Sequence, residues 1–162
     1  MILWVCSGSL IKWRSFQTAK LLNEVIGIPL EVIEEIRELN SYGILSGVNK
    51  QEAKKIFAHV FQKPEYQNVG YYLGTTFLGG ENIQEFDQRV KKAMELIIQK
   101  SRGLSTIAIV THGGVYRSIY KNILKIDQKL EHIEDLATTI MTYEKGEYNI
   151  VHTEGIELGG KI

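Results

Sequence analysis

The residue most suited to chemistry is His112, which follows a short apolar run and precedes two glycines. The run, Thr106 to Thr111, is rich in β-branched residues and predicts a strand buried on both faces. Ligands in open α/β sheets bind at the carboxyl ends of parallel strands, where this pattern delivers the imidazole. Gly113 and Gly114 would form a tight turn whose backbone N–H groups suit an anion. A strand-to-helix turn carrying a structural histidine is the alternative interpretation.

Arg14 is the second candidate, because it begins a predicted helix just past the first predicted strand. Two neighbouring parallel strands can bring their ends, and so Arg14 and His112, together over one pocket. A guanidinium beside an imidazole suits a phosphate, since arginine offers a fork of charged donors. An exposed helix arginine is the alternative interpretation.

Two carboxylates are the acidic candidates. Glu38 follows the second predicted strand, on the same carboxyl-end side as His112. Beside a phosphate oxygen it could protonate a leaving alcohol. Glu81 directly precedes Asn82, where capping or the helix dipole explains it without catalysis. Surface carboxylates are common, and an exposed position is the alternative for each.

The loop after the second strand carries polar residues that could contact a substrate. These are Tyr42, Asn49 and Lys50, for which a solvated loop position is the alternative. We interpret the other histidines, His59, His132 and His152, as structural.

Cys6 is the only cysteine, which excludes an internal disulfide and a cysteine-based zinc site. The segment from Val5 to Arg14 resembles the cysteine phosphate loop of low-molecular-weight tyrosine phosphatases. Its spacing between Cys6 and Arg14 is too long, and no Asp-Pro pair is present. We therefore interpret Cys6 as a buried, inert residue.

The elements that must position these residues alternate along the chain. Strands are predicted over Ile2–Cys6, Ile28–Ile33 and Thr106–Thr111, with a strand pair around Glu144–Glu147. Such alternation predicts an α/β fold of three layers, with a mainly parallel sheet and helices on both faces.

A helix is predicted over Trp13–Ile26, with Gly27 as its C-terminal cap. Two further helices, Asn49–Phe61 and Asn82–Gln99, are each predicted to begin with a capping box. The helical spacing predicts three inward faces. The first is Trp13, Phe16, Leu21, Leu22, Val25 and Ile26; the second is Ala53, Ile56, Phe57, Val60 and Phe61; the third is Ile83, Phe86, Val90, Met94 and Ile97.

The composition is that of one ordinary domain over residues 1–162, with 19 basic and 19 acidic side chains. Zero formal charge gives no sign of a nucleic-acid partner. The apolar start is too short for a signal peptide or a membrane span. We expect a cytoplasmic protein without a metal ion or other cofactor.

Four segments, in order, resemble motifs of the histidine phosphatase (phosphoglycerate-mutase-like) superfamily. Arg14 to Leu22 resembles R-A-x-Q-T-A, and Arg37 to Gly47 resembles R-E-x-x-F-G-x-x-E-G with one extra residue. Gly79 to Val90 resembles G-G-E-S-x-x-E-F-x-x-R-V, and Thr111 to Arg117 resembles the motif of the family's second histidine.

The resemblance implies a phosphoglycerate-mutase-like fold and a metal-independent phosphohistidine mechanism acting on small phosphomonoesters. His112 would take the second-histidine role, Arg14 the second-arginine role and Glu38 the proton-donor role. Arg14, His112 and Gly113 would bind phosphate, and Tyr42 and Lys50 would contact the substrate. The absence of the mutases' W-R-R-S segment favours a small phosphatase. The family's nucleophile lies in an Arg-His-Gly motif that this sequence does not contain.

Three hypotheses follow. The first is a phosphatase domain, N-terminally shortened and impaired because the nucleophilic histidine is absent. The second is a non-catalytic relative that binds a phosphorylated ligand or a protein partner through Arg14 and His112. The third is a cysteine phosphatase. A sheet that lacks the family's first strand would leave an edge exposed, which predicts a homodimer.

Overall fold

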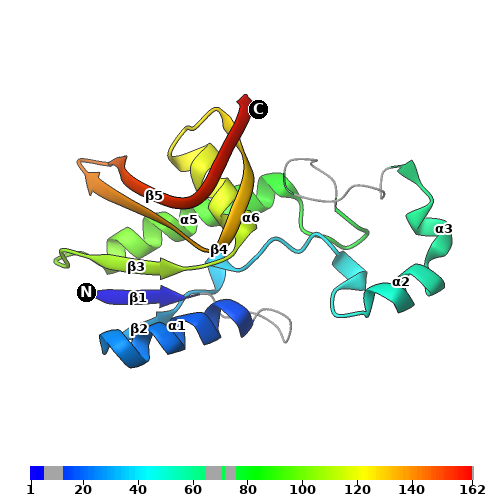
Figure 1. Ribbon diagram of the computed structural model, residues 1–162, viewed down its shortest axis with the longest axis horizontal. Coiled ribbons are helices and arrows are strands. Elements are labelled where there is room, and N and C mark those ends of the chain that lie inside the picture. The colour runs from blue at the N-terminus through cyan, green and yellow to red at the C-terminus, as the bar shows by residue number, and fades with distance from the viewer. Residues whose placement is uncertain (6–12, 65–70, 72–75, 162) are drawn as a thin grey trace. The chain divides into compact units, whose positions relative to one another are not determined.

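The computed structural model describes residues 1–5, 13–64, 71 and 76–161 (Figure 1). It divides into two compact units, Met1–Val115 and Tyr116–Ile162. The expectation that residues 1–162 form one domain stays a prediction. Cys6 lies outside the described residues, so its predicted burial stays a prediction as well.

The first unit is built on a parallel sheet with the strand order β2-β1-β3 (Figure 1). Strand β1 (Ile2–Val5) is central, between β2 (Leu30–Val32) and β3 (Ile107–Val110). Trp4 pairs with Ile109 and Val5 with Val110, so the ends of β1 and β3 lie side by side. The predicted parallel α/β arrangement is confirmed.

Helices cover both faces of this sheet. Successive side chains of a strand point to opposite faces. Leu3 and Val5 pack with Ala19 of α1 (Trp13–Ile26), whereas the buried Trp4 donates its indole N–H to Ser101 at 3.0 Å. Ser101 is the C-cap of α5 (Ile83–Lys100), which therefore ends on the face opposite α1.

Strand β3 is less buried than its apolar sequence predicts. All four of its residues are half-buried, so the prediction of burial on both faces is wrong. The physical reason is its place in the sheet. Among the described residues of this unit, β3 pairs with β1 on one side and has no strand on the other.

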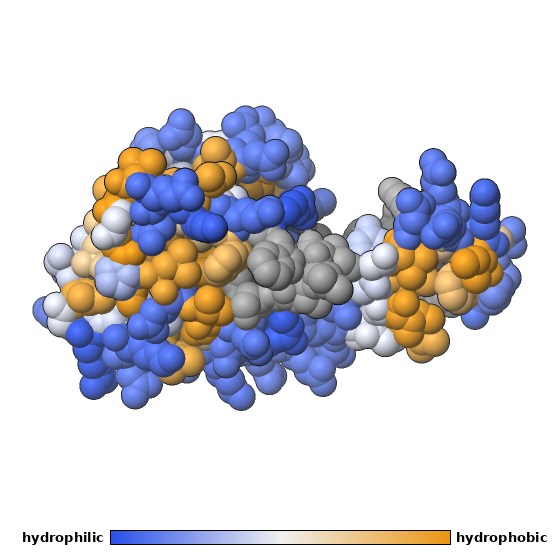
Figure 2. Space-filling model, turned by 90° about the horizontal axis from the view of Figure 1, so that it is seen from below, coloured by the Kyte–Doolittle hydropathy of each residue, from blue (hydrophilic) through white to orange (hydrophobic). Residues whose placement is uncertain are grey.

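Helix α1 has the predicted bounds, but of its predicted inward face Phe16 packs against the core whereas the residues of the last two turns do not. Gly27 ends it with φ +64° and donates its N–H to the carbonyl of Asn23 at 2.9 Å, as a C-terminal cap does. The buried positions are instead Ser15 and Ala19, one helical turn apart. Leu21, Leu22, Val25 and Ile26 are between 42% and 89% exposed, and Figure 2 shows apolar surface on this side of the molecule.

The second predicted helix is two short helices, α2 (Lys50–Ile56) and α3 (Ala58–Phe61), separated at Phe57. The side chain of Asn49 caps α2 by accepting from the N–H groups of Gln51 and Glu52. A small core forms around Leu45, Ala53 and Phe77, with Phe57, Val60 and Phe61 packed against it. Ile56, the last residue of α2, is 65% exposed, against the prediction, because the core is reached from α2 through Ala53.

Helix α5 agrees with the sequence. Asn82 is its N-cap, and Phe86, Val90, Ala93, Met94 and Ile97 are its buried residues. Two 3-10 turns, η1 (Glu34–Ile36) and η2 (Gly43–Leu45), shape the loop between β2 and α2. Gly43 has φ +50°, and a side chain there would overlap the backbone of Leu78 and Gly80. Glycine is therefore required where the two loop segments meet.

The second unit is a helical turn and a long hairpin. Helix α6 (Gly113–Ser118), which crosses the unit boundary, continues as the π-helix η4 (Ile119–Ile123). Strands β4 (Gln128–Glu144) and β5 (Glu147–Lys161) pair antiparallel, as predicted. Lys145 and Gly146 both have positive φ, as a tight hairpin turn requires. In the part of the chain that is described, no helix is long and apolar enough to cross a bilayer.

Candidate functional site

His112 lies at the carboxyl end of β3, as predicted, and is half-buried. The backbone before it is held by Thr111, whose hydroxyl donates to the carbonyl of Ile36 at 2.9 Å. Its ring nitrogen Nε2 lies 3.1 Å from the hydroxyl of Ser15. The first turn of α1 and the end of β3 therefore meet at the imidazole.

Glu38 reaches the same point from the loop after β2. Its carboxylate accepts from the N–H of Leu39 at 2.8 Å and from the N–H of Gly114 at 3.1 Å. A side chain on residue 114 would overlap Glu38 Oε1, so only glycine allows this approach. The extra residue in the loop motif does not keep Glu38 away from the turn that follows His112.

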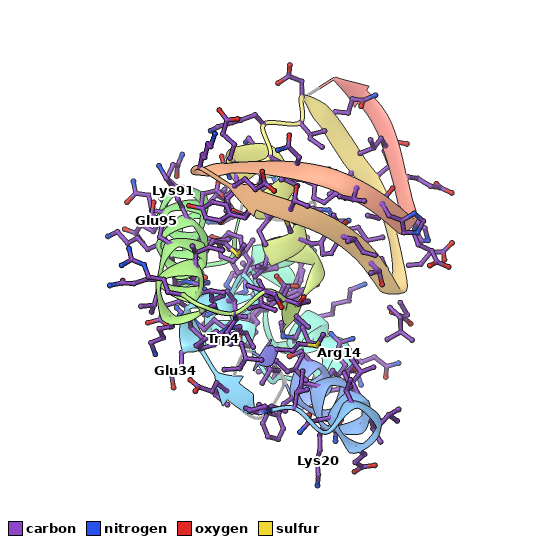
Figure 3. The ribbon with its side chains drawn as sticks, turned by 90° about the vertical axis from the view of Figure 1, so that its left-hand side faces the viewer. Trp4, Arg14, Lys20, Glu34, Lys91 and Glu95 are labelled. Atoms are coloured by element: carbon purple, nitrogen blue, oxygen red, sulfur yellow. The ribbon has the colours of Figure 1, made fainter. Side chains whose placement is uncertain are left out.

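Arg14 and Gly113 are direct sequence neighbours of Ser15 and His112, the two residues that meet at this site. Arg14 lies in the first turn of α1, directly before Ser15, and its side chain is exposed (Figure 3). Gly113 is half-buried and begins α6. Because Ser15 contacts His112, the start of α1 lies beside the imidazole, as expected from neighbouring strand ends.

A cluster of hydrogen bonds around Arg89 holds the Glu38 loop against α5. The guanidinium of Arg89 donates to both carboxylate oxygens of Glu81 at 2.7 Å. It also donates to the backbone carbonyls of Glu35 and Arg37. We call these contacts of Arg89 with Glu81, Glu35 and Arg37 the Arg89 bracket. They fix the position of the backbone on the N-terminal side of Glu38.

Glu81 is explained by this bracket and not by helix capping, which Asn82 performs. Burial of the carboxyl group would by itself raise its pKa. Hydrogen bonds and charge from Arg89, with Arg37 and the N–H of Asn40, outweigh burial and hold the pKa of Glu81 below its ordinary value. Glu81 is therefore an ionised structural partner, and the structural interpretation of this residue is supported.

The residues expected to contact substrate lie on the next part of the chain. Tyr42 is 53% exposed and stacks on Phe77 with ring centroids 6.1 Å apart. Asn49 is used as the cap of α2, and Lys50 is the first residue of that helix. The substrate roles of Tyr42 and Lys50 stay predictions.

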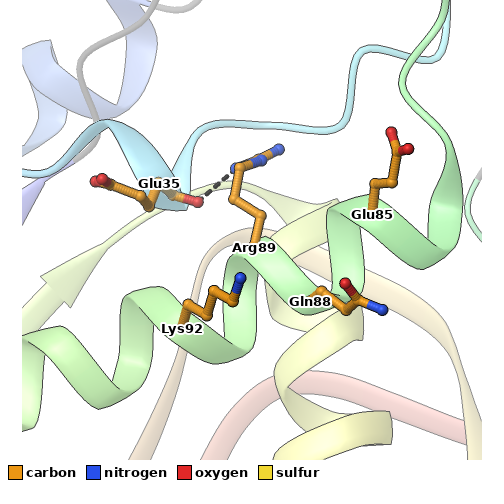
Figure 4. A pocket seen from close by; sticks show the side chains of 5 residues that line it. All are labelled: Glu35, Glu85, Gln88, Arg89 and Lys92. Carbon is orange, nitrogen blue, oxygen red and sulfur yellow. Dashed lines mark hydrogen bonds between the residues drawn. The ribbon is translucent and has the colours of Figure 1, made fainter.

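A shallow surface pocket of about 290 Å³ lies elsewhere, along α5 (Figure 4). It is lined by Glu35, Glu85, Gln88, Arg89 and Lys92. None of the predicted site residues lines it, and its arginine is engaged in the Arg89 bracket. Among the described residues, no group of three or more histidine, cysteine or acidic side chains is arranged to hold a metal ion.

The order of Arg14, Glu38, Glu81 and His112 along this fold agrees with a known family. Residues 12–154 match the model of the histidine phosphatase superfamily, branch 1. This chain belongs to the histidine phosphatase superfamily. Phosphoglycerate mutase-like protein 4 of Arabidopsis thaliana is 29% identical to it over 136 residues, which cover 83% of this chain and 56% of the relative.

Several solved structures share the fold. The phosphoglycerate mutase of Bacillus anthracis superposes with a TM-score of 0.63 at 20% identity, covering 96% of this chain and 72% of the mutase. A mycobacterial glucosyl-3-phosphoglycerate phosphatase superposes with a TM-score of 0.57 at 16% identity, covering 93% of this chain and 75% of that protein. The chain spans about half the length of the curated relatives it matches.

Two residues of the site were not identified from the sequence. Ser15 stands at the alanine position of the R-A-x-Q-T-A motif that Arg14 to Leu22 resembles. This difference was the one feature of the sequence that could have drawn attention to Ser15. Arg89 lies eight residues after Glu81, about two helical turns, which is too far apart for a local pairing rule to connect them.

Proposed function

We propose that this chain binds the phosphate group of a small phosphomonoester at His112, Arg14 and Gly113. The proposed reaction is the superfamily's metal-independent phosphohistidine hydrolysis, impaired here because the sequence contains no Arg-His-Gly nucleophile. In that reaction His112 and Arg14 stabilise the phosphoryl oxygens, and Glu38 protonates the leaving alcohol. No cofactor or nucleic acid takes part, and the site of action is the cytoplasm.

The observation that carries this proposal is the convergence of Glu38 on the turn after His112. The carboxylate accepts from the Gly114 N–H at 3.1 Å, two residues past the imidazole. A proton donor must lie near the oxygen that leaves, and the phosphate ligands must lie near the phosphorus. The hydrogen bond supports both roles because it holds the Glu38 carboxylate at the turn that follows His112.

A non-catalytic phosphate binder is the second candidate. The absence of an Arg-His-Gly triplet from the sequence favours it. Arg14 and His112 would still bind a phosphate group, because guanidinium and imidazole N–H groups donate hydrogen bonds to its oxygens. Tyr42 and Lys50 would contact the rest of the ligand in either case.

We also propose that two copies associate along the edge of β3 that pairs with no strand among the described residues of the first unit. In the parallel ladder with β1, alternate residues of β3 direct their peptide groups toward β1 and away from it. Unpaired strand edges favour association with another chain. A homodimer in light scattering at micromolar concentration would support this proposal, and a monomer would contradict it.

The function is tested by separating binding from turnover. Hydrolysis of p-nitrophenyl phosphate and calorimetric binding of orthophosphate are measured for the wild type, His112→Ala, Glu38→Gln and Cys6→Ser. His132→Ala serves as the matched control, because His132 is exposed and lies on β4.

Turnover that is lost in His112→Ala and kept in Cys6→Ser would support the impaired phosphatase and exclude the cysteine phosphatase. Binding without turnover, abolished in His112→Ala alone, would support the phosphate binder. If the wild type neither binds orthophosphate nor hydrolyses the aryl phosphate, both candidates are wrong.

A further inference from the structure

The hydroxyl of Ser15 and the imidazole of His112 form a contact across 97 residues of sequence. Ser15 Oγ lies 3.1 Å from His112 Nε2, within hydrogen-bond distance. Ser15 is only 5% exposed and sits next to Arg14 in the first turn of α1. The contact therefore joins Ser15 to His112, the central residue of the candidate site.

A serine at this position needs a physical reason. Alanine would fill much the same space and is the better helix former. A buried hydroxyl also costs free energy unless it is hydrogen-bonded. Ser15 faces inward with Ala19, so a small side chain suffices for packing and the hydroxyl is an addition. Its bond with His112 offsets part of this cost.

The chemistry of the pair suits a histidine that must keep one orientation. A hydroxyl can donate or accept, so Ser15 can remain bonded to Nε2 of a neutral or a protonated ring. The main chain around His112 is already fixed by the Thr111 bond to Ile36 and by the Gly114 bond to Glu38. The contact with Ser15 acts on the imidazole ring itself, which the backbone bonds do not contact.

We propose that Ser15 is a positioning residue that orients the His112 imidazole for phosphate. Because this inference rests on the proposed phosphate site, its test needs one measurement that is independent of phosphate. Nitrogen NMR of the His112 ring supplies it, since the ring nitrogen shifts report protonation, tautomer and hydrogen bonding directly.

The variants separate the hydroxyl from the volume it fills. Ser15→Ala and the nearly isosteric Ser15→Cys remove the strong hydrogen bond, whereas Ser15→Thr keeps a hydroxyl. Ser101→Ala is the matched control, because Ser101 is also a buried serine, 7% exposed, that bonds a distant side chain, Trp4, at 3.0 Å. It removes a comparable bond away from His112.

We expect Ser15→Ala and Ser15→Cys to shift the His112 ring signals and to weaken orthophosphate binding about two- to tenfold. Ser15→Thr should restore both, and Ser101→Ala should change neither. Unchanged ring signals, or unchanged affinity despite shifted signals, would overturn the inference. If the wild type binds no orthophosphate, the proposed function fails separately. In that case, unchanged ring signals in Ser15→Ala would also overturn the role of Ser15 in positioning His112. Shifted ring signals would support the contact between Ser15 and His112 but not a role in phosphate binding.

Discussion

The carboxylate of Glu38 accepts a hydrogen bond from the backbone N–H of Gly114 at 3.1 Å, although the two residues are 76 positions apart. The contact requires glycine at position 114, because a Cβ atom would overlap Glu38 Oε1. It brings the loop after β2 to the turn after β3, so the predicted acid and the predicted phosphate ligand share one corner of the first unit.

Gly114→Ala should therefore disturb this corner directly. The added methyl group meets the tip of a flexible side chain, so the carboxylate moves and the fold survives. We expect a loss of about 1–2 kcal/mol in the free energy of unfolding, measured by urea denaturation. Gly160→Ala, which has open space around its Cβ, should stay within about 0.5 kcal/mol of the wild type. Equal effects of the two variants would contradict the close approach of Glu38.

The Arg89 bracket should contribute strongly to stability. Arg89→Met keeps the aliphatic stem but leaves the Glu81 carboxylate and the carbonyls of Glu35 and Arg37 without this donor. Arg89 and Glu81 are each 13% exposed at the side chain, so water replaces the lost bonds poorly. We expect a loss of about 2–3 kcal/mol in urea denaturation. The exposed Lys91→Ala on the same helix should change stability by less than about 0.5 kcal/mol.

Glu81 should make stability depend on acid. Burial alone would raise the pKa of Glu81, but Arg89 holds the pKa of this carboxyl group in the folded protein below its ordinary value. The unfolded chain therefore takes up the proton first as the pH falls. The stabilisation is present above about pH 4.5 and is lost as the pH falls through the folded pKa. Urea denaturation between pH 7 and 3 should show this loss.

Glu81→Gln should remove that part of the pH dependence, because glutamine does not titrate. The exposed Glu24→Gln on α1 should keep the wild-type profile. An unchanged acid profile in Glu81→Gln would show that other groups govern acid unfolding.

Tyr116 should make the second unit sensitive to alkali. Its hydroxyl and that of Tyr120 both lie against Thr139 Oγ1, and burial raises the pKa of Tyr116 to about 12. The unfolded chain releases this proton near pH 10, so the stabilisation is present below pH 10 and lost as the pH rises toward 12. Tyrosine absorbance near 295 nm should contain a late-titrating component.

Tyr116→Phe should remove this late component and reduce the alkaline loss of stability. Tyr42→Phe, which changes an exposed ring, should keep the component. A late component that persists in Tyr116→Phe would assign it to another tyrosine and contradict the effect of burial on Tyr116.

The local elements followed from local chemistry. Asn49 and Asn82 cap the helices they were expected to cap, and Gly27 ends α1 as predicted. These features depend on hydrogen bonds within a few residues, which a single sequence displays. The inward face predicted for α1 was right for Phe16 but wrong for Leu21 and Val25, because burial depends on which face of the helix meets the sheet and not on apolar character alone. The small residues Ser15 and Ala19 occupy that face.

The resemblance to the superfamily, the alternation of strands and helices, and the placement of His112 at a strand end can all be read from the order of residues. Which side chains meet at that strand end depends on how the chain packs. Ser15 reaches His112, Glu38 reaches Gly114, and Arg89 binds Glu81 and the loop carbonyls. The reason is physical: caps and periodicity act over a few residues, whereas these contacts join segments that only the packing of the chain brings within hydrogen-bond distance.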